Sequence, residues 1–75
     1  MMTQKNLKQK AIVVEVINKR IFRVKLEDGT EVLGILSTKI EARHPSLLVG
    51  DDIVVLRNPY ENNRVKIHED TWGKR

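Results

Sequence analysis

The sequence has no cysteine, two prolines, and only one phenylalanine, one tyrosine and one tryptophan in 75 residues. Without cysteine, the chain can form neither disulfides nor a thiolate metal site, so a reducing cytoplasm is expected. No apolar run approaches the roughly 18 residues of a transmembrane helix. The first ten residues are polar and basic, so they predict neither a secretory signal nor an anchor. Together these absences predict a soluble cytoplasmic protein with no membrane partner.

The charged residues are unbalanced in favour of cations. Fourteen Lys and Arg face ten Asp and Glu, which gives a formal net charge of +4 and a pI near 9.7. Such an excess favours polyanionic partners, because each phosphate that a cation neutralises releases bound counterions. Charge alone leaves two interpretations open: a nucleic-acid-binding surface, or lysines that are simply solvated.

Short β-branched runs separated by turn signals predict a small all-β barrel or sandwich. We expect strands at residues 11–17, 21–26, 30–36, 53–56 and 64–68. In the second strand, Phe22, Val24 and Leu26 share one face. Arg23 and Lys25 share the other, which is the two-residue period of a half-buried strand. Phe22 is therefore expected in the core.

Three local signals connect these strands. Asp28-Gly29 predicts a tight hairpin between the second and third strands, because such turns need positive φ angles. Gly34, inside the third strand, marks an expected bulge or barrel corner. Residues 37–43 predict one or two helical turns capped by Ser37, which end at His44-Pro45 because the residue before a proline avoids the helical region.

Five strands with a helical turn between the third and fourth match the OB fold, a partly open five-stranded Greek-key barrel. We therefore expect an all-β OB-fold domain over residues 10–69. A disordered basic arm is expected at 1–9 and a flexible tail at 70–75, where Trp72 could fold back onto an apolar patch.

Enzyme chemistry finds little support. His44 and His68 lack the close spacing of a helical metal pair and have no cysteine to join them. The acidic pairs at 51–52 and 69–70 need not converge, since neighbours on a strand point to opposite faces. No serine stands in a nucleophile elbow, and no glycine-rich phosphate loop is present. We expect no catalytic residue, no cofactor and no metal site.

Basic residues on the strand faces favour RNA binding. Arg23 and Lys25 share the outer side of the second strand, and Arg64, Lys66 and His68 that of the fifth. On an OB barrel, oligonucleotides bind across the face of the second and third strands and the flanking loops. Exposed aromatic residues for base stacking are scarce, so folded RNA read through phosphates and 2′-hydroxyls fits better than a loose single strand. A merely solvated exterior is the plain alternative.

Several segments, in order, carry a family resemblance between Lys10 and Ile67. They are FRVKLEDG at Phe22–Gly29, Ser37-x-Lys39, LLVGD at Leu47–Asp51, and Pro59-Tyr60 followed by Arg64-Val65. In these the chain resembles bacterial-type translation initiation factor one, an S1-like OB-fold family. Arg23, Lys39 and Arg64 match basic residues of that family, and Tyr60 matches its Pro-Tyr loop.

The resemblance implies a factor that occupies the A site of the small ribosomal subunit during initiation. It would touch small-subunit rRNA and a neighbouring ribosomal protein, and act with two other initiation factors. A monomer is expected. From the strand faces and the resemblance together, the candidate RNA-binding residues are Arg23, Lys25, Lys39, Arg43, His44, Tyr60, Arg64 and Lys66.

The chain departs from that family in the loop after the third strand. Ser37-Thr38-Lys39-Ile40-Glu41 stands where the family usually has Ser-Gly-Lys-Met-Arg, and His44-Pro45-Ser46 replaces a segment with an aromatic and an arginine. One hypothesis is a divergent initiation factor whose reduced loop charge is offset by Lys5, Lys8 and Lys10. A second is a paralogue or general RNA chaperone without an A-site role. A third is an OB module that binds only protein.

Overall fold

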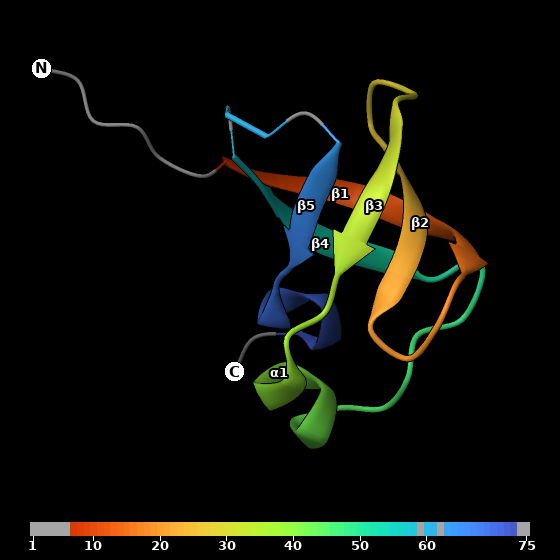
Figure 1. The fold of residues 1–75 in the computed structure, drawn as a ribbon, viewed down its shortest axis with the longest axis vertical. Helices are drawn as coiled ribbons and strands as arrows, with labels where there is room; N and C mark the ends of the chain where they lie inside the picture. Colours follow the sequence, from red (N-terminus) through yellow and green to blue (C-terminus); the bar gives the residue numbers. More distant parts are fainter. Residues whose placement is uncertain (1–6, 59, 62, 74–75) are drawn as a thin grey trace, which may run out of the picture.

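The computed structural model describes residues 7–58, 60–61 and 63–73. Figure 1 shows five strands wrapped around one core, with a short helix beyond the end of β3 and a 3-10 helix after β5. The elements are β1 (Leu7–Val16), β2 (Ile21–Leu26), β3 (Glu31–Ile35), α1 (Thr38–Arg43), β4 (Asp52–Arg57), β5 (Arg64–Ile67) and η1 (Glu69–Trp72).

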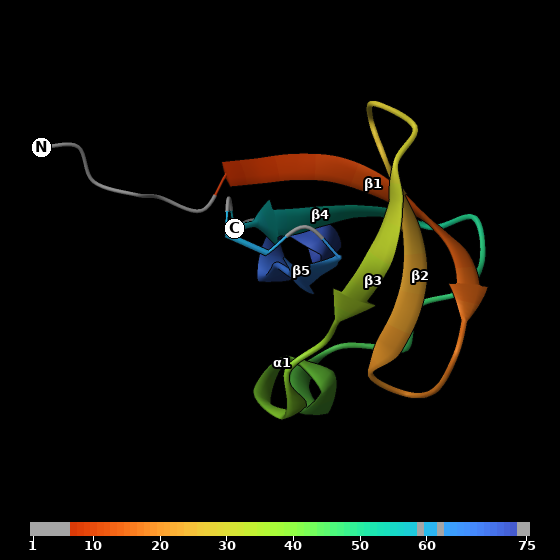
Figure 2. The same ribbon diagram turned by 45° about the horizontal axis from the view of Figure 1, so that its top comes forward.

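The strands form a closed barrel in the order β1-β2-β3-β5-β4. All neighbouring pairs are antiparallel except β3 and β5, which are parallel over three residue pairs. Figure 2 shows β1 and β4 running alongside one another and crossing β2 and β3. This arrangement confirms the expected five-stranded OB barrel with a helical turn between the third and fourth strands. The barrel is closed instead of partly open.

β1 begins earlier than the sequence predicted. Leu7–Ile12 pair with residues 57–52 of β4, so the backbone of three polar or exposed residues, Leu7, Lys8 and Gln9, is in the sheet. The expected arm at 1–9 is corrected accordingly, and its remaining part, residues 1–6, lies outside the described residues. Backbone pairing with a distant strand explains the difference, because it does not need an apolar side chain.

The prediction for the chain after β5 also differs from the structure. His68 ends the strand instead of continuing it, and its Nδ1 accepts a hydrogen bond from the Asp70 N–H at 2.9 Å as the cap of η1. The Thr71 hydroxyl donates to the Val54 carbonyl and accepts from the Val54 N–H. Trp72 packs against the core. The ordered domain therefore extends through η1, where a flexible tail was expected from residue 70; residues 74–75 lie outside the described residues.

The hairpin between β2 and β3 turns at the predicted place. Gly29 has a φ of +91°, and the Thr30 N–H donates to Asp28 Oδ1 at 2.9 Å. Hydrogen bonds from the Thr30 N–H and hydroxyl, with the nearby Arg57 guanidinium, hold the pKa of Asp28 below its ordinary value. Asp-Gly thus sets the register of β2 against β3.

Gly34 does not form a bulge, which was one of the two roles expected for it beside a barrel corner. It pairs regularly with Phe22 of β2 and Val65 of β5, while the register shift lies in β1 between Val13 and Glu15. A Cβ on Gly34 would lie 3.1 Å from Val24 Cγ1. A side chain here would be tightly packed, because β2 and β5 bring the core side chains of Val24 and Ile67 against the Gly34 backbone.

The helical turn forms as predicted over Thr38–Arg43. Ser37 Oγ accepts a hydrogen bond from the Ile40 N–H at 3.2 Å, and His44 returns to an extended backbone. A serine cap satisfies a backbone donor that a short helix cannot satisfy itself. The side chain of Lys39 is positioned by this turn.

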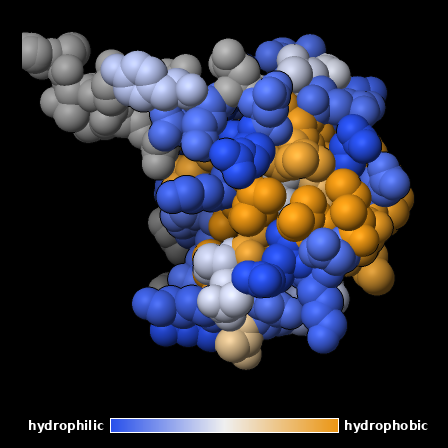
Figure 3. Space-filling view, viewed as in Figure 1, coloured by the Kyte–Doolittle hydropathy of each residue, from blue (hydrophilic) through white to orange (hydrophobic). Residues whose placement is uncertain are grey.

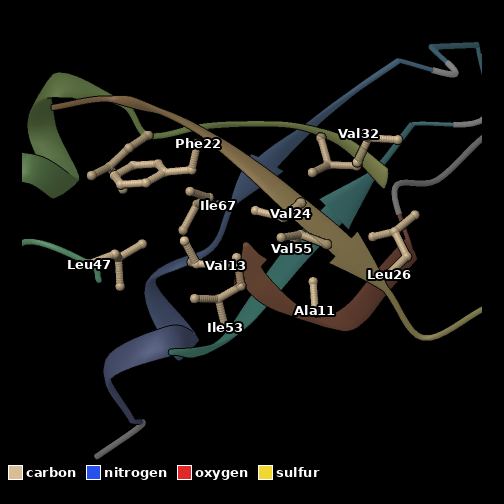
Figure 4. Close-up of a cluster of buried hydrophobic side chains, with 12 residues drawn as sticks. Ala11, Val13, Phe22, Val24, Leu26, Val32, Leu47, Ile53, Val55 and Ile67 are labelled. Atoms are coloured by element: carbon tan, nitrogen blue, oxygen red, sulfur yellow. The ribbon is translucent and has the colours of Figure 1, made fainter. Parts of the chain in front are cut away.

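Twelve buried hydrophobic side chains fill the barrel, and the described residues include no buried polar or charged side chain. Phe22 is only 1% exposed, which confirms its predicted place in the core. Figure 4 shows Phe22 and Leu47 at the end near α1, and Leu26 and Val32 toward the opposite end. Leu47, from the loop between α1 and β4, thus helps to close the barrel. Within the described part of the chain, no helix is long and apolar enough to cross a membrane.

Candidate nucleic-acid interface

The outward side chains of β2, β3 and β5 form one continuous face, which we call the basic face. Burial alternates along each strand, so every second residue points outward. Its members are Ile21, Arg23, Lys25, Glu31, Leu33, Ile35, Arg64 and Lys66. In Figure 3 apolar residues gather over β2 and β3, with hydrophilic residues around them. The face therefore has an aliphatic centre and a mostly cationic rim.

The strand registers place these side chains in rows. Arg23 of β2 lies opposite Leu33 of β3, which lies opposite Arg64 of β5. In the next row, Ile35 lies between Ile21 and Lys66. Neighbouring strands are about 4.8 Å apart, so Arg23 and Arg64 stand about 10 Å apart across the sheet. Candidate residues from two distant segments are thereby brought onto one surface.

The candidate arginines are held by carboxylates. Arg23 Nε lies 3.0 Å from Glu15 Oε1, and Arg64 Nη2 lies 3.9 Å from Glu61 Oε2. Both pairs are exposed, so they contribute little to folding stability and are screened by salt. Each arginine could exchange its carboxylate for a phosphate, because the guanidinium accommodates either anion with the same geometry.

The candidate lysines are free of such partners. Among the residues that the structure describes, Lys25, Lys39 and Lys66 form no ion pair. Lys25 and Lys66 lie on the basic face, and Lys39 lies on α1. Their positive charge is therefore available to attract a polyanion without first breaking a contact.

Arg43 and His44 both contact another residue of the chain, Glu69. Arg43 Nη1 lies 3.1 Å and His44 Nε2 3.2 Å from Glu69 Oε2. These two hydrogen bonds, from His44 first and then Arg43, hold the pKa of Glu69 below its ordinary value. The imidazole of His44 also stacks on Trp72. The structure thus gives both residues a role in joining α1 to η1.

A shallow groove continues from the basic face toward this junction. Lining it are Ile35, Ser37, Ile40, Leu56, Lys66, Ile67, His68 and Glu69. Its walls come from α1 and the start of η1, and its floor from the strands of the barrel. The junction between Arg43, His44, Glu69 and Trp72 therefore fixes the two walls of a groove that borders the basic face.

Tyr60 is the exposed aromatic among the candidates. It lies in the loop between β4 and β5 and is 75% exposed, and its N–H donates to Asn58 Oδ1 at 2.8 Å. Its expected neighbour in the Pro-Tyr pair, Pro59, lies outside the described residues. Tyr60 is thus accessible to a base or a sugar, although it stands in the loop and not on the basic face.

Sequence reasoning missed the aliphatic centre of the basic face and the glutamates beside its arginines. The signal for the centre was present, since Leu33 and Ile35 alternate with Val32 and Gly34 and so occupy the outward side of β3. No comparable signal in the sequence indicates that Glu15 pairs with Arg23 or Glu61 with Arg64. Within the described residues, no group of three or more His, Asp or Glu side chains could hold a metal ion.

No family model matches the sequence. Among solved structures, the chain is similar to the solution structure of translation initiation factor one from the Wolbachia endosymbiont strain TRS of Brugia malayi. The TM-score is 0.67 at 22% sequence identity, over 84% of this chain and 75% of the other. Strand order, the helix between β3 and β4 and this likeness together show that the chain has the OB fold of translation initiation factor one.

Proposed function

We propose that the protein is a translation initiation factor that binds the A site of the small ribosomal subunit through small-subunit rRNA. The observation that carries this proposal is the basic face, where two strands distant in sequence present Arg23, Lys25, Arg64 and Lys66 together. The shared fold with a translation initiation factor supports it. The protein acts by binding and performs no covalent step.

The mechanism follows from charge and rigidity. Unpaired Lys25, Lys39 and Lys66 attract the phosphate backbone, and the arginines then exchange their carboxylates for phosphates. A closed barrel keeps these cations at fixed spacing, so it recognises a preformed RNA shape and not a flexible strand. Tyr60 and the aliphatic centre add contacts to sugars, bases or the neighbouring ribosomal protein. Bound in this way, the domain blocks the A site while the other initiation factors act.

Sedimentation with purified small subunits tests the proposal. We expect saturable one-to-one binding, enhanced by the other initiation factors and displaced by tRNA bound in the A site. Lys66→Glu and Arg64→Glu should weaken it, whereas the charge-conserving Lys66→Arg should retain most of it, because the lysine acts as a point charge. Binding that is neither saturable nor displaced by A-site tRNA would contradict the A-site role.

A second candidate function is that of an RNA chaperone or paralogue with the same barrel. The unpaired lysines favour it equally, since they attract any RNA. It predicts comparable affinity for small subunits and for unrelated structured RNA, with no effect of the other factors. A module that binds only protein would instead show partner affinity that is indifferent to salt, even after Lys39→Glu or Arg64→Glu.

A further inference from the structure

One row of side chains crosses the basic face, and a glutamate lies beside each of its two arginines. In order, it contains Glu15 of β1, Arg23 of β2, Leu33 of β3 and Arg64 of β5, and Glu61 lies against Arg64 from the preceding loop. Two arginines therefore flank one leucine, and each lies within ion-pair distance of a carboxylate.

Folding stability does not account for these carboxylates. The side chains of Glu15 and Arg23 are 57% and 45% exposed, and those of Glu61 and Arg64 are 47% and 61% exposed. Exposed pairs of this kind add little to stability, because water screens them and long side chains lose freedom. Two negative charges thus lie beside the arginines of a surface whose lysines attract phosphate.

We propose that Glu15 and Glu61 are specificity-determining residues of the RNA site. This inference rests on the proposed function. Each competes with phosphate for its arginine, so a lone or badly placed phosphate must displace a carboxylate and meets its repulsion. An RNA surface that reaches Arg23 and Arg64 together, about 10 Å apart, replaces both weak ion pairs by arginine–phosphate contacts, and the displaced carboxylates turn away from it. A phosphate that engages neither guanidinium leaves both carboxylates in place and meets their repulsion. Generic RNA is thereby disfavoured relative to the matching one.

The division of labour between cations supports this assignment. Every described arginine has a carboxylate within 4.0 Å, whereas Lys8 alone among the described lysines does. Lysine is a point charge that attracts phosphate without geometric preference, and arginine is a fork that selects geometry. Most of the described lysines, which do not select geometry, thus have no carboxylate partner, whereas the described arginines, which do, each have one.

The test compares Glu15→Gln, Glu61→Gln and the double variant with Glu27→Gln. Glutamine keeps the shape but removes the charge, and Glu27 is an exposed glutamate with no ion pair among the described residues, so its variant changes net charge equally. Binding to poly(U) RNA and to purified small subunits is measured for each variant at low and moderate salt, after circular dichroism has confirmed folding.

Glu15→Gln and Glu61→Gln should each bind poly(U) about two- to five-fold more tightly than Glu27→Gln does. This factor corresponds to the free energy of one exposed ion pair. Affinity for small subunits should rise less, so the preference for subunits falls, most in the double variant. Equal gains for both RNAs, or no gain beyond Glu27→Gln, would overturn the inference while leaving subunit binding intact. Folded wild-type protein that binds neither RNA would overturn the proposed function itself, and this inference with it.

Discussion

The imidazole of His44 lies stacked on the indole of Trp72, with ring centroids 4.4 Å apart and planes 8° from parallel. Arg43 and His44 both reach Glu69, so four residues join the end of α1 to η1. We call these four residues the α1–η1 clamp. Because α1 and η1 form the walls of the groove beside Lys66, the clamp sets the shape of this part of the surface.

Replacing Trp72 should loosen the clamp. Stacked ring pairs contribute about 0.5–1.5 kcal/mol beyond the area that they bury, so Trp72→Ala should lower the free energy of unfolding by about 1–2 kcal/mol. Urea denaturation followed by circular dichroism measures this. Trp72→Phe keeps a ring against His44 and should lose less; equal losses in both variants would argue against the stack.

Acid should release the same clamp through Glu69. Its pKa lies below the ordinary value in the folded protein, because it accepts hydrogen bonds from His44 and Arg43. Its contribution to stability is therefore complete above the unfolded-state pKa and is lost as the pH falls through the lowered folded-state pKa. The stability difference between wild type and Glu69→Gln should be present at neutral pH and vanish in acid.

Trp72 fluorescence during urea denaturation, repeated across a pH series, measures this difference. The chain has a single tryptophan, so the signal reports on the clamp itself. Subtracting the Glu69→Gln profile removes the titration of groups that do not contact Glu69. A stability difference that stays constant across the series would show that the Glu69 carboxylate is not what holds the clamp.

Gly34 should tolerate no side chain unless Val24 gives way. A Cβ there would lie 3.1 Å from Val24 Cγ1 and 3.4 Å from two atoms of Ile67. Gly34→Ala should therefore cost about 1–3 kcal/mol through overpacking. In a double-mutant cycle with Val24→Ala, the combined loss should be smaller than the sum of the single losses. Additive losses would indicate that the strain arises elsewhere.

Substitutions of Phe22 and Arg64 should affect different properties, Phe22→Ala the stability of the fold and Arg64→Ala the binding to small subunits. Phe22 is buried, so Phe22→Ala should cost about 3–5 kcal/mol and could unfold a barrel this small. Arg64 is exposed, so Arg64→Ala should leave the melting temperature nearly unchanged and weaken binding to small subunits. Thermal unfolding and co-sedimentation of both variants check the pair, and an unchanged melting curve for Phe22→Ala would refute its structural role.

The salt dependence of binding should distinguish free from engaged cations. Lys66→Ala should reduce the slope of log affinity against log salt by roughly 0.7–0.9, the value for one phosphate contact. Lys66→Arg should preserve the slope, since the charge is kept. Arg43→Ala should leave it nearly unchanged, because Arg43 lies on α1, away from the basic face, and joins α1 to η1 through Glu69. A loss of slope with Arg43→Ala would place that guanidinium on RNA.

Local sequence patterns by themselves determined many of the secondary-structure elements and turns of this protein. The bounds of β2, the hairpin at Asp28-Gly29, the Ser37 cap and the burial of Phe22 all follow from alternation or turn chemistry within a few residues. Such features depend on backbone geometry that each segment carries by itself. The OB fold could be predicted because its five strands and one helical turn each left such a signal.

Tertiary structure alone decided which side chains are available to a ligand. β1 begins at Leu7 because β4 offers backbone partners, and His44 is engaged because Trp72 and Glu69 fold back onto it. Partnership between Arg23 and Glu15 likewise depends on strand register. The physical reason is that hydrogen bonds, stacking and ion pairs act over a few ångströms in space. Their partners can therefore be distant in sequence, where no local pattern indicates them.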